Sequence, residues 1–281
     1  IDIPEELRKG QLKEPYFRRI REAINLERDD EDPGMDLDSI LNASNTDIEK
    51  IVDGVIEKLL NTGINPAGPF PSYEEYGDNA KWTKAVDWER NKYSIETTPK
   101  EEFYKKVRTK CRAELLTTAF GSNKRTFEQL ALGYFKVKNT NDVEQEFFDS
   151  AIRILGESWR IYDTNRRYLP KGFPKRLWKY AEKVYGDKMR GDHPKMDALK
   201  SALITLELVK SDTDISLTGE GIEFVPFEKC EFVWKCQRCG TVHLHHSKEV
   251  CTFCGDKLDD SCKIDAKDYE KPDTIYTSGL L

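Results

Sequence analysis

Apolar residues recur at helical spacing in several separate stretches of the chain, and these stretches predict most of its secondary structure. The expected helices are 4–26, 48–60, 99–119, 142–162, 175–185 and 194–210. Residue types at their starts agree, since Thr46 and Glu49 have the spacing of a capping box and Pro99 suits a first helical position. The aromatic stripe of the 142–162 helix is expected to pack into a core.

Alternation of apolar and polar residues predicts two β-hairpins. One lies between Ile215 and Val225, around Gly219 and Gly221. Because two helices precede it, this order suggests a winged helix. The other is shorter and covers 241–248. The chain is therefore expected to be an α+β protein that is mostly helical.

Four of the seven cysteines form two C-x2-C pairs, Cys236 with Cys239 and Cys251 with Cys254, separated by eleven residues. Two residues between cysteines allow both thiolates of a pair to reach one ion at about 2.3 Å, and the second pair completes a tetrahedron. A glycine follows each second cysteine, where a tight turn is needed. This spacing predicts one structural Zn²⁺ in a C-terminal zinc ribbon.

Other uses of these cysteines are less consistent with the pattern. Two pairs at ribbon spacing argue against a redox C-x-x-C, and four cysteines leave no open position for catalytic zinc. An iron–sulfur cluster also takes four cysteines and stays open as an alternative. Three histidines on the connecting hairpin are expected at the surface, because the cysteines already complete the tetrahedron: His243, His245 and His246.

Composition along the chain suggests four segments. Residues 1–98 form an acidic helical region with a Pro/Gly-rich loop, and 99–226 form a helical domain that ends in the winged helix. The zinc ribbon takes 227–262, and 263–281 is a tail.

The segment 160–190 is basic, although the whole chain has a net charge of -6. It holds ten lysines and arginines against three acids, with aromatic residues between them. Cations neutralise phosphates and aromatic rings stack on bases, so this segment is a candidate nucleic-acid interface. The candidate residues are Arg166, Arg167, Lys171, Lys175, Arg176, Trp178 and Lys179. The alternative is an amphipathic helix with core aromatics and a solvated basic face.

Motifs for catalysis are missing from the sequence. There is no GxxxxGK[ST] phosphate loop, G-x-S-x-G elbow or H-E-x-x-H helix, and no paired-carboxylate signature. We therefore do not expect a self-sufficient enzyme, although a carboxylate site without a sequence signature stays an alternative. The absence of an apolar run of about 18 residues argues against a membrane span, and the cysteine usage favours a reducing cytoplasm.

Three stretches together resemble the region between the two motor lobes of large bacterial superfamily 2 helicases of the kind found in phage-defence systems. They are 60–69 (LNTGINPAGP), 120–134 (FGSNKRTFEQLALGY) and the ribbon from Trp234 to Cys254. The resemblance implies a DNA-handling accessory region of an ATP-driven translocase whose ATP-binding motifs lie outside this span. Only the four zinc ligands carry over as functional residues, and the missing initiator Met fits a fragment.

The partners expected on this basis are nucleic acid, with DNA preferred, and the motor lobes of the same polypeptide or of a helicase partner. The competing hypothesis is a protein–protein interaction or structural module. In that case the ribbon and the acidic N-terminal helices would dock on a partner or on the motor lobes.

Overall fold

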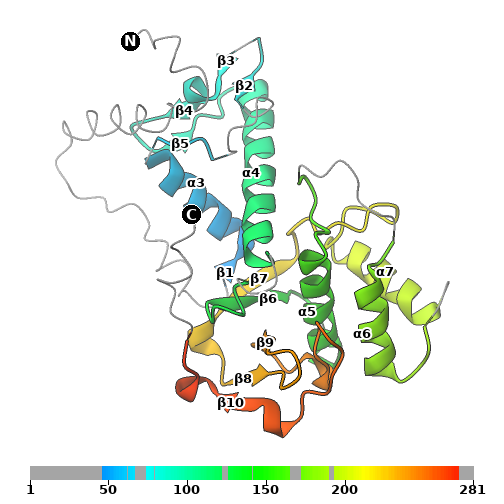
Figure 1. The fold of residues 1–281 in the computed structure, drawn as a ribbon. Coiled ribbons are helices and arrows are strands. Elements are labelled where there is room, and N and C mark those ends of the chain that lie inside the picture. Colours follow the sequence, from blue (N-terminus) through cyan, green and yellow to red (C-terminus); the bar gives the residue numbers. More distant parts are fainter. Residues whose placement is uncertain are drawn as a thin grey trace. The chain divides into compact units, whose positions relative to one another are not determined.

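A computed structural model of the chain describes residues 46–61, 63–66, 74–78, 80–121, 126–140, 142–164, 172–189 and 193–271 (Figure 1). The chain forms two compact units. Among the described residues, the first comprises 49–112 and the second comprises 46–48 with 113–271. The helix predicted over 4–26 lies outside the described residues.

The first unit contains most of two helices, α3 (Ile48–Asn61) and α4 (Thr98–Ala119), which begin close to the predicted positions, while the end of α4 from Ala113 belongs to the second unit. Four two-residue strands pair as hairpins between them, and a 3-10 turn η3 (Trp82–Ala85) separates the hairpins. These strands are β2 (Glu75–Tyr76), β3 (Ala80–Lys81), β4 (Val86–Asp87) and β5 (Lys92–Tyr93). Arg108 of α4 makes ion pairs with Glu49 at 2.8 Å and with Asp53 at 3.0 Å, which fix the register between the helices.

The second unit contains an antiparallel sheet in the order β1 (Thr46–Asp47), β7 (Ile222–Pro226), β6 (Gly133–Val137). Phe135 of β6 lies opposite Phe224 of β7, and their rings are 5.6 Å apart. Both side chains are buried, so this cross-strand aromatic pair forms part of the core.

The predicted hairpin between Ile215 and Val225 is wrong. β7 pairs with β6 and β1 instead, while Leu217 makes only isolated bridges to Ile161 and Val209. Gly219 and Gly221 have positive φ angles, so the chain does turn there, but the segment before the turn does not pair with β7. The strand pairing on which the winged-helix interpretation rests is therefore not formed.

Three further helices belong to the second unit: α5 (Asp142–Glu157), α6 (Lys175–Tyr185) and α7 (Pro194–Thr205). All three begin where the sequence predicts. α5 and α7 end earlier than predicted, because Trp159 and Glu207 adopt positive φ angles of 61° and 58° just beyond them. Figure 1 shows α5 and α6 next to each other.

The ribbon forms a second three-stranded sheet in the order β10 (Lys263–Asp265), β8 (Phe232–Lys235), β9 (Val242–His243). The short hairpin predicted within 241–248 is not formed, because only β9 lies in that segment and it pairs with β8, which precedes the first cysteine pair. β10 extends the sheet beyond residue 262, where the sequence predicts a tail. Val233 and Val242 pack with Phe227 into a small core, so the ribbon is also stabilised by apolar contacts.

The α+β class predicted from the sequence is confirmed, with helices and small antiparallel sheets in the described part of the chain. None of the helices that the structure describes has the length and apolar character that a membrane crossing requires.

Candidate metal centre and adjoining pocket

The four predicted cysteines come together at one end of the ribbon. Their sulfur atoms all lie within 4.8 Å of one another. Cys236 Sγ is 3.6 Å from Cys254 Sγ, and Cys239 Sγ is 3.6 Å from Cys251 Sγ. Four sulfurs that bind one ion tetrahedrally at about 2.3 Å would be about 3.8 Å apart. The thiols are free, so the cluster has the donor set and spacing of a single metal site.

Two tight turns bring the sulfurs together, one in the first knuckle (236–240) and one in the second knuckle (251–255). Gly240 donates its N–H to Cys236 O at 2.8 Å, and Gly255 donates to Cys251 O at 2.9 Å. Both glycines have positive φ angles, 73° and 72°. The glycines therefore have the turn role that the sequence predicts.

The surroundings shift the thiol pKa values of Cys239, Cys251 and Cys254 unequally. Burial raises the pKa of Cys251, and it raises the pKa of Cys254 to about 11. Burial alone would also raise the pKa of Cys239, but hydrogen bonding with Thr241 and the neighbouring thiols brings it down to about 7. A buried thiolate needs a compensating positive charge, so the site favours a cation over four ionised sulfurs alone.

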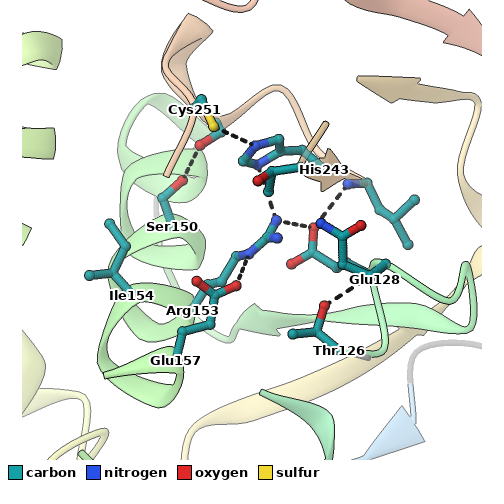
Figure 2. Close-up of polar contacts among 12 residues, drawn as sticks. Thr126, Glu128, Ser150, Arg153, Ile154, Glu157, His243 and Cys251 are labelled. Atoms are coloured by element: carbon teal, nitrogen blue, oxygen red, sulfur yellow. Dashed lines mark hydrogen bonds and ion pairs between the residues drawn. The ribbon is translucent and has the colours of Figure 1, made fainter. Parts of the chain in front are cut away.

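The expectation that the hairpin histidines lie at the surface is wrong for His243 and His245. His243 is fully buried, and His245 is 8% exposed. His243 Nε2 lies 3.4 Å from Cys251 Sγ, and its Nδ1 lies 3.0 Å from Arg153 Nη1 (Figure 2). Arginine can only donate, so Nδ1 is the acceptor and the neutral ring donates from Nε2 to the sulfur. Burial and the charge of Arg153 lower the pKa of His243, which keeps the ring neutral.

Arg153 of α5 is the centre of a buried polar cluster behind the cysteines (Figure 2). Its Nη1 donates to Glu128 Oε2 at 2.6 Å, and its Nε donates to Glu157 Oε1 at 2.8 Å. Glu128 Oε2 also accepts the Leu244 N–H at 3.0 Å. A chain of hydrogen bonds therefore leads from the helical part of the unit to Cys251. No sequence motif marks these residues, which come from segments far apart in the chain.

A second buried contact joins the ribbon to α5 and α6. Ser150 Oγ and Ser247 Oγ are 2.7 Å apart, and Tyr180 donates its hydroxyl to Ser247 O at 2.9 Å. All three residues are buried. The chain directly before the second knuckle is thus fixed to both helices.

The basic candidates of 160–190 have different positions. Arg166, Arg167 and Lys171 lie outside the described residues. Lys175 and Lys179 are exposed on α6. The other two candidates on α6 make contacts within the protein: Arg176 donates to Glu157 Oε2 at 2.7 Å, and the Trp178 ring meets Phe173 at 6.4 Å.

A pocket of about 580 Å³ lies between α6 and the second knuckle. We call it the α6–knuckle pocket. α6 contributes Lys175, Arg176, Lys179, Tyr180, Glu182 and Lys183 to its lining, and the knuckle contributes 251–255. Four of these side chains are cationic and one is a carboxylate, so the lining is positive. Lys183 is a lining residue that the sequence reasoning did not select.

Comparisons with protein-family models, curated proteins and solved structures find no match to this chain. Functional inference therefore depends on the cysteine cluster, the buried polar contacts and the α6–knuckle pocket.

Proposed function

We propose that this chain is a zinc-ribbon module that engages nucleic acid, DNA in preference, through the α6–knuckle pocket. The observation that carries the proposal is the row of exposed lysines on α6 that lines this pocket beside the cysteine cluster. We expect no catalysis from the metal centre, because four cysteine ligands complete the coordination of zinc.

The metal part of the proposal is supported by the donor set. Four sulfurs within 4.8 Å of one another suit one zinc ion, which when bound would link the two knuckles. His243 would support the site from outside, because a hydrogen bond to a ligand sulfur orients it and reduces its excess negative charge. Metal analysis of the purified protein distinguishes zinc from an iron–sulfur cluster.

The nucleic-acid part is supported by spacing and charge. Lys175, Lys179 and Lys183 are four residues apart, so they lie on one face of α6. All three are exposed, and no ion pair involves them in the part of the chain that the structure describes. Their row is about 12 Å long at 1.5 Å per residue. About three phosphates of a strand would fit along this length.

Fluorescence anisotropy with labelled single-stranded and duplex DNA tests the lysine row. The variant is Lys175→Gln, Lys179→Gln and Lys183→Gln combined, which removes charge while keeping helix propensity. Arg176 is left intact, since its pairing with Glu157 is structural. Wild-type binding should weaken with salt, and the variant should lower the slope of log K against log salt by about 2 for single strands.

The matched control removes three lysines from the first unit: Lys50, Lys92 and Lys106 to Gln. These side chains are also exposed, so the net charge changes equally. If both triple variants weaken DNA binding equally, α6 is not the binding face and the effect is only one of net charge. Absence of binding at low salt would reject the nucleic-acid proposal and favour the protein-docking module.

We further propose that the module works as an accessory region of an ATP-driven helicase or translocase. This part is supported by the sequence resemblance of 60–69, 120–134 and the ribbon, and by the lack of motor motifs in the sequence. Addition of the purified chain to motor lobes that lack it should restore DNA-stimulated ATP hydrolysis. No change in that rate would refute this part of the proposal.

A further inference from the structure

Phe253 is a large apolar side chain that remains exposed in the middle of the second knuckle. It lies between the ligands Cys251 and Cys254, and 46% of its surface is accessible. Arg176 Cζ lies over the ring, 5.9 Å from its centroid, in the α6–knuckle pocket. The knuckle therefore presents an aromatic ring to the same pocket that the lysine row of α6 lines.

Thr252, the neighbour of Phe253, has a buried hydroxyl without a partner. The residue is 1% exposed, and its Oγ1 makes no hydrogen bond to any described residue. Buried hydroxyl groups in native proteins are nearly always hydrogen-bonded. Thr252 lines the α6–knuckle pocket, but its hydroxyl is closed to solvent, so a bound group with a donor or acceptor would provide the missing partner after the Thr252 side chain rotates towards the pocket.

Lys183 connects these features to the lysine row. Its Cγ lies 3.8 Å from the point that a Cβ of Gly255 would occupy, so the aliphatic part of the lysine passes along the knuckle. The pocket volume of about 580 Å³ is within the range of sites that hold a small organic ligand. One pocket thus combines an aromatic ring, an unpaired buried hydroxyl and a line of cations.

We propose that this pocket holds one unpaired nucleotide of a single strand, with its base stacked on Phe253. Thr252 Oγ1 hydrogen-bonds to that nucleotide, and the neighbouring phosphates follow Lys175, Lys179 and Lys183. The inference rests on the proposed nucleic-acid function and adds strand selectivity to it. A paired base offers no free face to an aromatic side chain, whereas an unpaired base of any sequence does.

The test compares Phe253→Ala, Phe253→Trp and the control Ile204→Ala, which shortens another exposed apolar side chain of the same unit. Affinity is measured by anisotropy for oligodeoxythymidylate, oligouridylate and a blunt DNA duplex of equal length at one salt concentration. Zinc content is determined for each variant, so that only proteins with equal metal loading are compared. The two single strands distinguish DNA from RNA as the source of the nucleotide.

Phe253→Ala should weaken single-strand binding by between about 5-fold and 150-fold, the range for loss of one base–aromatic stack. Duplex affinity and the salt slope should change by less than about twofold, because the lysines remain. Phe253→Trp should retain binding, and a new tryptophan emission should be quenched when the strand is added. Thr252→Val should weaken single-strand binding while leaving zinc content unchanged.

Two results would overturn the inference alone. One is a Phe253→Ala effect no larger than that of Ile204→Ala, and the other is equal weakening of single-strand and duplex binding. In both cases the lysine triple variant would still reduce salt-dependent binding, so the proposed function would stand. If the wild-type protein binds none of the three nucleic acids at low salt, the inference and the proposed function both fail.

Discussion

Replacement of Arg153 by methionine tests the buried cluster behind the cysteines most directly. The Arg153 side chain is 3% exposed and its partner Glu128 is 8% exposed, so both charges are removed from water. Removal of one member of a buried ion pair costs about 3–5 kcal/mol, because the other charge stays buried without compensation. Glu128 would keep only the Leu244 N–H as a donor, and His243 Nδ1 would lose its partner.

The matched variant Glu128→Gln should cost less, about 1–2 kcal/mol, because it weakens a buried hydrogen bond without leaving a charge uncompensated. Arg153 keeps a carboxylate partner there, because its Nε still donates to Glu157 at 2.8 Å. The double variant should cost less than the sum of the single variants, since the uncompensated charge is gone. The two single variants should therefore differ in cost, because Arg153 has a second carboxylate partner and Glu128 has no second cationic partner among the residues that the structure describes.

Urea unfolding at pH 8 with saturating zinc measures these free energies of unfolding. Lys267→Met is the control, because its ion pair with Asp265 is exposed and should contribute below about 0.5 kcal/mol. A cost below about 1 kcal/mol for Arg153→Met would refute the reasoning, as would a larger cost for Glu128→Gln.

The pH dependence of the Arg153→Met variant gives a further check. Burial raises the pKa of Glu128 to about 7, and the nearby Arg153 acts to lower it. Without that cation the folded-state pKa rises further above the unfolded value. A raised folded-state pKa gives stability that is lost as pH increases, so the variant should be more strongly destabilised at pH 8 than at pH 6.

Three other predictions concern the metal, a buried acid and a glycine. Metal analysis should find about one zinc per chain, and chelation should expose the ligand thiols to a thiol reagent; less than half an equivalent with freely reacting thiols would contradict the site. Burial raises the pKa of Asp149 from 3.8 to about 7, so its contribution to stability should be present near pH 4 and lost as pH rises to 7.5. Asp149→Asn keeps the acceptor for the Val137 N–H and should remove up to about 4 kcal/mol of this pH dependence. Identical curves of unfolding free energy against pH for the wild type and Asp149→Asn would contradict this prediction. Gly133→Ala should destabilise by more than about 2 kcal/mol in thermal or urea unfolding, since φ is 150° and the new Cβ would lie 2.4 Å from Val225 O; a neutral result would show that β6 can shift.

The four-cysteine cluster has support from the rest of the second unit that an isolated ribbon would lack. Cys251 is connected to Arg153 through His243, and the chain before the second knuckle is held by Ser150 and Tyr180. Outer hydrogen bonds of this kind orient ligands before the metal arrives. We therefore expect substitutions on α5 to change zinc affinity even though α5 supplies no ligand.

Local patterns were sufficient for the features that depend on neighbouring residues. The C-x2-C-G repeats predicted that the four cysteines come together and that both turns form, and the helix-start signal predicted where α6 begins. The capping-box signal was less exact, because Thr46 lies in β1 and α3 begins at Ile48. Helix ends were predicted less well. Trp159 and Glu207 adopt positive φ angles that end the helices, and the spacing of apolar residues gives no sign of this. The predicted Ile215–Val225 hairpin is not formed, because β7 pairs over five residues with β6 instead.

Tertiary structure alone decided what surrounds the ligands. His243 looked like a surface residue beside a complete tetrahedron, but folding buries it between Cys251 and Arg153. The lysines of α6 and the exposed Phe253 are ordinary residues in the sequence and become one pocket only when α6 packs beside the second knuckle. The cysteine cluster followed from the sequence because C-x2-C spacing is local chain geometry. The residues that support the cluster did not, because Arg153, Tyr180 and Glu128 contact the ribbon from segments about 70 to 120 residues away, and their approach depends on the packing of the whole unit.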